Sequence, residues 1–371
     1  MRIGIMTFWE SKNNYGQILQ LFALQQYLKK LGHDPFLIRF KRVPPNDTRT
    51  LIQKIRDEGL LRLILQKLEA PKRKKSIELD KLRHFRAFKA ENIVFGKKDY
   101  RNLAELRADP PKADVYIVGS DQVWNNKFSV SAEPFLLGFG DDRIKRISYA
   151  ASFGQSVIDE ETQLLFKKYL PAFKAISVRE KSGVDICNHM GVAAEWLPDP
   201  TLLFEAREWE DMLCLNMPNN INQKSIFAYT LGNSKIKDLD KFVGFLRRKS
   251  GYKLIRAGAN SDFSGDCYPT IPEWVAHIKQ ADFVLTTSFH GMVFCIIYNT
   301  NFVILPNTGK ALGMNERIVS LLAKLGLQDH IMDKYSHEKL NGLFTKKVNW
   351  GYVNEQLSNW RIEANEFLMR L

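Results

Sequence analysis

Residues 283 to 295, Phe-Val-Leu-Thr-Thr-Ser-Phe-His-Gly-Met-Val-Phe-Cys, pass from an apolar strand through a short polar turn into an apolar helix. Such a strand is buried in a parallel sheet, so the turn lies at the carboxyl end of the strands, where open α/β sheets bind ligands. The free N–H groups that begin the next helix favour an anion there. His290 stands at this point, and imidazole titrates near neutral pH. We expect His290 to act as an acid toward a bound phosphate; the alternative is a capping turn with a packed imidazole.

The same alternation of short β-rich runs and helical stretches covers most of the chain, which favours parallel sheets with crossover helices. It stops at the polar stretch 216–223 and then restarts. The predicted fold class is α/β, with two Rossmann-like doubly wound domains facing a cleft in a GT-B-like arrangement. The predicted parts are a first domain at 1–218 with a basic helical insertion at 41–110, a second domain at 219–345, and a C-terminal helix at 346–371 that packs back on the first domain.

The predicted strands of the first sheet are 2–8, 35–40, 115–118, 146–150, 175–178 and 195–197, and those of the second are 226–231, 253–257, 283–287 and 302–305.

Composition narrows the class of protein. A chain of 371 residues with 45% hydrophobic content can build two cores. No run approaches the 18 or more apolar residues that a membrane span needs. The four cysteines are scattered without a Cys-x-x-Cys pair, which argues against a zinc knuckle or a redox motif. We predict a cytoplasmic protein without a metal or a cofactor.

Positive charge is concentrated in residues 41–90, which carry 15 Lys and Arg against 6 Asp and Glu, a local +9 of the net +13. An apolar stretch at 60–68 precedes the basic run Lys72-Arg73-Lys74-Lys75. This pattern is typical of a segment that lies on an anionic membrane, here the inner face of the plasma membrane. A helical insertion with a solvated basic face is the alternative. Nucleic acid is not expected as a partner, because no recognised nucleic-acid motif accompanies the charge.

Polar residues follow the first strand in the run Asn13-Asn14-Tyr15-Gly16-Gln17. This is the position of a nucleotide or substrate loop in Rossmann-like domains. A single glycine cannot offer the usual pyrophosphate cradle, so dinucleotide binding is weakly supported. Asn14 and Tyr15 are candidates for a polar contact with an acceptor, and a plain turn is the alternative.

Two further strands end in residues suited to a sugar site. Gly119-Ser120-Asp121-Gln122-Val123-Trp124 places a carboxylate and an indole after one strand. Asp121 is a candidate to take a proton from a sugar hydroxyl and Trp124 to face a pyranose ring; a cap and a core tryptophan are the alternative. Ser152 lies in Ala-Ala-Ser-Phe-Gly after the next strand, where small residues allow close approach of a ligand.

Arg179 ends a fourth strand, next to a helix start. A guanidinium there suits bidentate binding of a carboxylate or a phosphate, and a salt bridge to an acid is the alternative. Asp199 stands between two prolines. The rigid backbone either fixes that carboxylate or only shapes the interdomain linker.

Taken in order, the motifs Gly-Ser-Asp-Gln-Val-Trp, Ala-Ala-Ser-Phe-Gly, Ser-Val-Arg-Glu, Asp-Pro-Thr and Thr-Ser-Phe-His-Gly resemble the polysaccharide pyruvyl transferase family, over residues 14 to about 327. The resemblance implies a GT-B-like fold and transfer of the enolpyruvyl carbons of phosphoenolpyruvate onto two hydroxyls of a sugar, which forms a cyclic pyruvate ketal and releases phosphate. Family members mostly decorate bacterial capsules, exopolysaccharides or cell-wall glycans. His290 matches the family's catalytic histidine, and Arg179 matches its phosphoenolpyruvate-binding arginine.

The resemblance makes phosphoenolpyruvate the donor and a sugar or lipid-linked oligosaccharide the acceptor, without metal or nucleotide. His290 is then the acid, and Asp121 is the candidate base on its position alone. The predicted substrate-binding residues are Arg179, Ser288, Phe289, Gly291, Asn14, Tyr15, Ser120, Trp124 and Ser152.

Two other functions are compatible with the same sequence. A GT-B glycosyltransferase using a nucleotide sugar is one, because architecture does not fix chemistry. Such an enzyme usually shows a ribose-binding carboxylate in its second domain, which we cannot identify here. A non-catalytic module that binds anionic glycan or nucleic acid through positive charge alone is the other, and it would not need His290 at a strand-to-helix turn.

Overall fold

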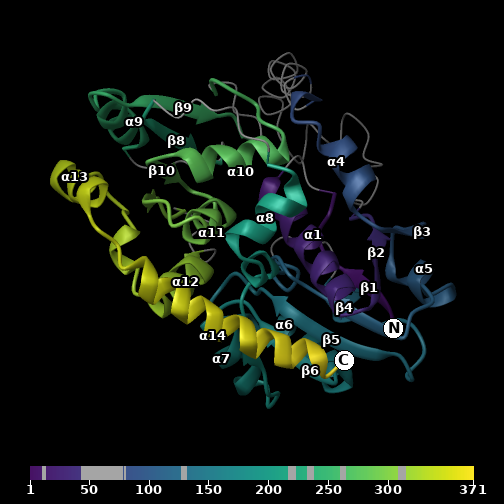
Figure 1. Ribbon diagram of the computed structural model, residues 1–371. Coiled ribbons are helices and arrows are strands. Elements are labelled where there is room, and N and C mark those ends of the chain that lie inside the picture. The colour runs from purple at the N-terminus through teal and green to yellow at the C-terminus, as the bar shows by residue number, and fades with distance from the viewer. Residues whose placement is uncertain are drawn as a thin grey trace, which may run out of the picture.

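The computed structural model describes residues 1–10, 14–42, 78, 81–126, 132–215, 223–231, 238–259, 265–307 and 315–371. These residues build two α/β domains that are stacked on each other (Figure 1). The apolar and basic run at 60–75 lies outside the described residues, so the predicted membrane contact stays a prediction. Within the described ranges, no helix is both long and apolar enough to cross a membrane.

The first domain is built on a parallel sheet of seven strands in the order β3-β2-β1-β4-β5-β6-β7. The order reverses between β1 and β4, which pair in parallel, so loops after these two strands border the crevice where such sheets bind ligands. The strands are β1 (Arg2–Met6), β2 (Asp34–Phe40), β3 (Phe95–Tyr100), β4 (Val115–Val118), β5 (Lys145–Ala151), β6 (Ala175–Val178) and β7 (Glu195–Trp196).

Helices cover both faces of this sheet. Helix α1 (Tyr15–Lys30) is apolar around most of its circumference and is buried over most of its length, because it lies between the sheet and the second domain (Figure 1). The other helices are α4 (Phe85–Asn92), α5 (Leu103–Ala108), α6 (Glu160–Tyr169), α7 (Lys181–His189) and α8 (Ala206–Leu213), with short 3-10 helices η1 (Glu133–Leu136), η2 (Leu170–Ala172) and η3 (Pro200–Leu203).

The second domain has a parallel sheet of four strands in the order β11-β10-β8-β9. Its strands are β8 (Ser225–Tyr229), β9 (Lys253–Ala257), β10 (Phe283–Thr286) and β11 (Phe302–Ile304). Its helices are α9 (Leu239–Arg247), α10 (Ile271–Gln280), α11 (Phe289–Ile297), α12 (Glu316–Lys324) and α13 (His337–Thr345), with η5 (Gln328–His330). Every residue of α11 is buried, and apart from His290 and Gly291 its sequence is apolar throughout.

The two domains share one apolar core. Tyr15 of α1 stacks on Trp274 of α10 with ring centroids 4.9 Å apart. Trp209 of α8 meets Phe294 of α11 edge to face at 5.0 Å. Aromatic pairs of this kind contribute beyond their buried area. The domains are therefore joined by a packed interior next to the site described below.

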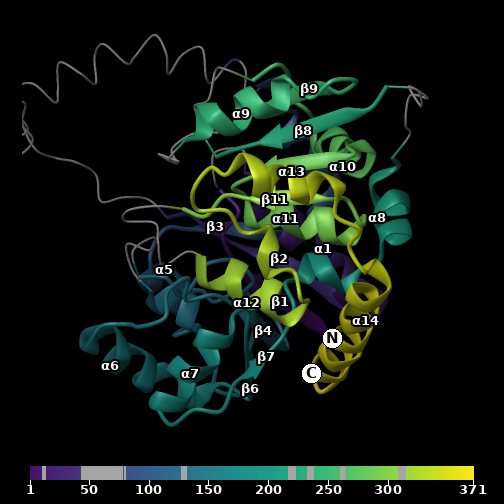
Figure 2. The ribbon, with the colours of Figure 1, turned by 90° about the vertical axis from the view of Figure 1, so that its left-hand side faces the viewer.

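Helix α14 (Trp350–Met369) returns from the second domain to the first, as Figure 2 shows. Trp360 donates from Nε1 to the Trp196 carbonyl at 3.0 Å, and Arg361 donates to the Leu202 carbonyl at 2.7 Å. In both views the C-terminus lies near the N-terminus, on the first domain.

Candidate active site

Side chains from both domains meet in an interdomain charge cluster, which we define as Asp121, Arg179, Asp199, His290 and Arg317. Asp121, Arg179 and Asp199 follow β4, β6 and β7 of the first domain. His290 lies in the first turn of α11 and Arg317 in the first turn of α12. All five are less than a tenth exposed, so charge interactions among them are only weakly screened.

Asp199 is the centre of this cluster. Its Oδ2 accepts hydrogen bonds from Arg179 Nη1 at 2.7 Å and Ser120 Oγ at 3.0 Å, and lies 3.4 Å from His290 Nε2. Its Oδ1 accepts from the backbone N–H and the hydroxyl of Thr201, at 3.0 and 2.7 Å. Burial alone would raise the pKa of Asp199, but His290 and Arg179 hold that pKa well below its usual range. The carboxylate is therefore ionised throughout the neutral range.

Asp121 is fixed by its backbone and by two hydrogen-bond donors, Gln17 Nε2 and the Gln122 N–H. It has φ of 70°, and the preceding Gly119 has φ of 114°, where a β-carbon would lie 2.2 Å from the Tyr149 carbonyl oxygen. Gln17 Nε2 donates to Oδ2 at 3.1 Å. Burial raises the pKa of Asp121, but Arg179 and Arg317 outweigh it, and the net direction is downward.

The two arginines lie on the ring of Phe289. Their guanidinium carbons are 4.8 Å (Arg179) and 5.2 Å (Arg317) from the ring centroid. Their ion pairs with Asp121 are long, at 3.6 and 3.9 Å. Burial and the like charge of Arg179 lower the pKa of Arg317 to about 10. Two guanidinium groups so close together have the geometry and charge that suit an anion.

Not every N–H donor of the Arg179 guanidinium group is used by the described residues. Its Nε is buried and donates no hydrogen bond to any described residue. Buried donors in native proteins are nearly always paired, and an unpaired one indicates a missing ligand or water. The free edge of Arg179 is therefore suited to a bound carboxylate or phosphate oxygen.

His290 is held by the start of α11. Ser288 caps this helix and accepts from the Gly291 N–H at 3.2 Å. A β-carbon built on Gly291 would lie 2.6 Å from Thr286 Oγ1, so only glycine fits there. Both residues thus shape the turn that carries the imidazole.

The structure brings several of the predicted residues together, namely His290, Asp121, Arg179, Phe289 and Ser120. Ser152 donates from its hydroxyl to Glu180 Oε1 at 3.1 Å, and Glu180 is the residue that follows Arg179 in the sequence. The same oxygen accepts from the Phe153 and Gly154 N–H groups, and burial raises the pKa of Glu180. Asn14 caps α1 by accepting from the Gln17 N–H at 3.3 Å.

Two predicted substrate-binding residues belong to the core instead. Trp124 is fully buried among aromatic rings, including Phe153 and Phe166, and its Nε1 donates to the Phe135 carbonyl at 3.0 Å. Its indole therefore offers no face to a sugar. Tyr15 is fully buried as well, and its hydroxyl donates to the Pro269 carbonyl, which links the two domains.

Sequence reasoning missed three members of the site. Asp199 was singled out only for its flanking prolines, and the motif Asp-Pro-Thr was the available signal. Gln17 ends the run 13–17, in which only Asn14 and Tyr15 were expected to contact a ligand, and the sequence around Arg317 shows no local sign of function. Arg317 belongs to the second domain and reaches Asp121 only because the two domains pack together, whereas Gln17 and Asp121 belong to the same domain.

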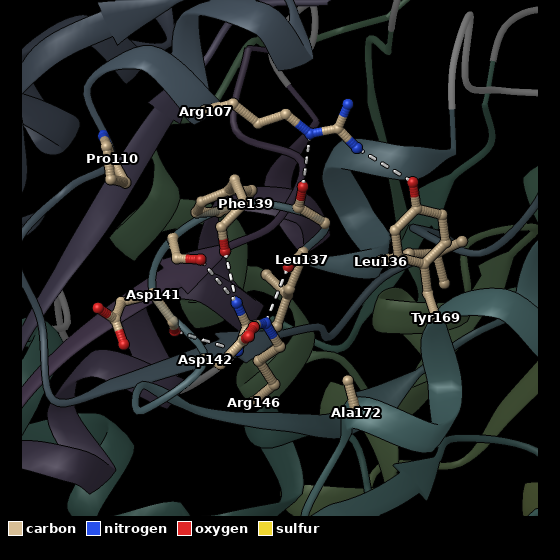
Figure 3. Close-up of a pocket in the computed structure, with 12 residues that line it drawn as sticks. Arg107, Pro110, Leu136, Leu137, Phe139, Asp141, Asp142, Arg146, Tyr169 and Ala172 are labelled. Atoms are coloured by element: carbon tan, nitrogen blue, oxygen red, sulfur yellow. Dashed lines mark hydrogen bonds between the residues drawn. The ribbon is translucent and has the colours of Figure 1, made fainter.

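The described residues contain no group of three or more His, Cys, Asp or Glu side chains arranged for a metal ion. A separate cavity of about 560 Å³ lies on the first domain (Figure 3). Arg146 fills its floor and donates to backbone carbonyls, among them those of Leu137 and Phe139. Arg107 is likewise bonded to the Gly138 carbonyl and the Tyr169 hydroxyl. These polar groups are already paired, so the interdomain charge cluster is the better candidate.

The fold is that of known GT-B proteins. The chain is similar to S. aureus MnaA in its structure with UDP, with a TM-score of 0.54 and 10% identity over 95% of this chain and 90% of that one. It is also similar to a Listeria monocytogenes protein assigned as a UDP-N-acetylglucosamine 2-epimerase, with a TM-score of 0.51 and 8% identity over 97% and 90%. At these identities the likeness is one of fold, which confirms the predicted GT-B-like architecture. No protein of curated function matches the chain.

The family assignment comes from the sequence. The family model for polysaccharide pyruvyl transferases matches residues 14–309, which include Asp121, Arg179, Asp199 and His290. The match spans both domains, and it covers well over half of the chain. The chain therefore belongs to the polysaccharide pyruvyl transferase family, as the order of its motifs predicted.

Proposed function

We propose that this transferase moves the pyruvyl group of phosphoenolpyruvate onto two hydroxyls of a sugar and releases phosphate. The observation that carries the proposal is the position of His290, which lies at a helix start among buried arginines and carboxylates of both domains. The family match supports the same reaction. The acceptor is proposed to be a sugar or a lipid-linked oligosaccharide of a bacterial surface glycan.

The donor carries a carboxylate and a phosphate, and the cluster offers a cation for each. Arg179 presents a buried Nε without a hydrogen bond to any described residue. Arg317 lies near the same Phe289 ring and, like Arg179, within 4 Å of Asp121 Oδ1. The N–H groups that begin α11 add a partial positive charge. These groups together match a small dianion better than a neutral ligand.

Ketal formation requires two proton movements. The first sugar hydroxyl adds to C2 of the enol while C3 gains a proton, and the second hydroxyl displaces phosphate from the same carbon. His290 is the proposed acid, which delivers the proton to C3 or to the departing phosphate. General acid catalysis of this kind contributes about 10² to 10⁴-fold.

Asp121 is the proposed base for the attacking hydroxyl. In the free enzyme its two arginine neighbours lower its pKa and make it a weak proton acceptor. A donor anion bound to Arg179 and Arg317 would draw their charge away from Asp121. Donor binding would then strengthen the base that the next step needs.

The test is phosphate release from phosphoenolpyruvate that depends on a sugar acceptor, followed by mass spectrometry of the glycan for an added pyruvate ketal. His290→Gln is expected to remove most turnover while the protein stays folded by circular dichroism. A variant with near wild-type rate would show that the histidine is structural. Release of nucleotide from a nucleotide sugar would favour a glycosyltransferase, and glycan binding without turnover would favour a binding module.

A further inference from the structure

Asp199 has no assigned role, although it accepts four hydrogen bonds and lies 3.4 Å from His290. Pro198 and Pro200 restrict the backbone on both sides of it. Thr201 occupies Oδ1 with two hydrogen bonds, and the side chain is fully buried. The remaining oxygen, Oδ2, is thereby held in one place and faces Arg179, Ser120 and His290. A carboxylate fixed in this way can fix the groups that it touches.

His290 depends on this oxygen. Its Nε2 is buried, has no hydrogen bond to any described residue, and lies 3.4 Å from Asp199 Oδ2. Contacts of catalytic groups are often long without substrate and shorten in the complex. On the other side of the ring, a β-carbon built on Gly16 would lie 1.9 Å from Nδ1, so the α1 backbone closes that side. The imidazole is held between Gly16 and Asp199.

The charges around the His290 ring also indicate that Asp199 is the residue that acts on the imidazole. The His290 ring lies 3.4 Å from the Asp199 carboxylate and interacts electrostatically with Asp121. These two carboxylates pair with Arg179 and Arg317, and both arginines also interact with the buried carboxyl of Glu180. Within the interdomain charge cluster, a protonated His290 adds a third cation to the two arginines, beside the two carboxylates of Asp121 and Asp199. If Asp199 were removed, the same three cations would have only one carboxylate to balance them. Because imidazolium is the only one of these cations that gives up its proton near neutral pH, it would be the one to discharge.

We propose that Asp199 is a positioning residue, which holds the His290 ring across the domain interface and places a negative charge beside the imidazole in its role as acid. The acid role rests on the proposed function; the effect on the imidazole itself does not. The two side chains come from different domains, so the acid is complete only when both domains are in place.

The first test is the pH profile of kcat with Asp199→Asn. The imidazolium loses its compensating charge, so the alkaline limb of the profile should move to lower pH by about one unit or more. A purely structural role would lower the rate at every pH and leave the limb in place. Asp159→Asn is the matched control, because Asp159 also caps a helix, through the Thr162 N–H at 2.8 Å, but lies outside the cluster. It should leave the limb unmoved.

Ser120→Ala is a milder variant in case Asp199→Asn fails to fold. It removes a neutral donor from the same Oδ2, so more of the negative charge acts on His290 and the limb should move to higher pH. A double-mutant cycle adds a second criterion. In the His290→Gln background, Asp199→Asn should cost little further kcat. A full additional loss would show that Asp199 acts through Arg179 instead and would overturn the proposal.

A readout without turnover separates this proposal from the proposed function. The chain has seven histidines, and His290 can be assigned by NMR in ¹⁵N-histidine-labelled protein through the signal lost in His290→Gln. The His290 titration midpoint should fall in Asp199→Asn. An unchanged midpoint would reject the inference even if pyruvyl transfer is found. A lowered midpoint would support it even if the protein proves to transfer another group.

Discussion

The imidazole of His290 lies directly against the α-carbon of Gly16, although the two residues belong to different domains. A β-carbon on Gly16 would fall 1.9 Å from Nδ1 and 2.3 Å from Cγ of the ring. No real side chain tolerates that approach. The glycine after Tyr15 is therefore required by the position of His290, and not by any turn of its own, since it lies in the first turn of α1.

Gly16→Ala should displace the His290 ring and lower kcat by about 10²-fold, the cost of a 1 Å error in a catalytic group. Overpacking should also lower the free energy of unfolding by about 1–3 kcal/mol. Gly342→Ala is the control, because a β-carbon there meets nothing within 4 Å. It lies inside α13 and should leave kcat unchanged while adding up to about 1 kcal/mol of stability. A fully active Gly16→Ala enzyme would show that the ring position is not needed.

Arg179→Lys keeps the charge but loses the planar fork. Its main effect should be a rise in KM for phosphoenolpyruvate of about 10- to 100-fold, equivalent to one charged hydrogen bond. Arg143→Lys, in the exposed pair with Asp141, should leave that KM unchanged. The measurement is the KM for phosphoenolpyruvate, from steady-state kinetics at varied phosphoenolpyruvate concentration. An unaltered KM in Arg179→Lys would place the anion site elsewhere.

Trp124→Phe tests the reassignment of this residue to the core. The substitution removes the hydrogen bond to the Phe135 carbonyl and leaves that oxygen buried, which should cost about 1–3 kcal/mol in the free energy of unfolding. The KM for the acceptor should not change. Denaturant unfolding and acceptor kinetics measure the two effects. A raised acceptor KM at unchanged stability would return Trp124 to the sugar site.

Acid should destabilise the protein through the cluster. Folding lowers the pKa values of Asp121 and Asp199, so the stability they contribute is present above the unfolded carboxyl pKa of about 4 and is lost as the pH falls below it. Glu180 acts in the opposite sense, because its raised pKa favours the folded state in acid. As the pH is lowered from about 6 to about 3, the melting temperature should fall less for Asp199→Asn than for wild type, because the variant lacks the Asp199 carboxylate. Equal slopes of melting temperature against pH in the two proteins would show that the Asp199 carboxylate is not stabilised by its charged neighbours.

Activity should persist in excess chelator, because the proposed reaction uses only the charged side chains of the interdomain charge cluster. The measurement is acceptor-dependent phosphate release before and after dialysis against chelator. Loss of activity that a divalent ion restores would refute the metal-free mechanism.

Much of the fold was predictable because buried parallel strands leave a plain signature. The run Val115–Val118 is uniformly apolar, and it forms β4 in the middle of the sheet. Strand β3, Phe95–Tyr100, was not predicted, because its sequence carries a glycine, two lysines and an aspartate. Such residues are tolerated there since β3 is an edge strand, half open to solvent.

The site was predictable where chemistry follows a strand and unpredictable elsewhere. Asp121, Arg179 and His290 end or follow strands, and parallel strands bring their carboxyl ends to one edge. Arg317 starts a helix, and nothing in its neighbourhood indicates a partner. The indole of Trp124 follows β4 as a ligand-binding residue would, but the local pattern cannot tell which way the ring points.

The return of α14 to the first domain makes the second domain an insertion within the first. Helix α14 hydrogen-bonds the carbonyls of Trp196 and Leu202, which lie 164 and 159 residues earlier in the chain than their donors. During synthesis on the ribosome, the surface of the first domain that α14 covers stays exposed until the whole second domain has been translated. Completion of the first domain therefore follows translation of the second, and a chain that stopped near residue 350 would contain both sheets but leave Trp196 and its surroundings uncovered.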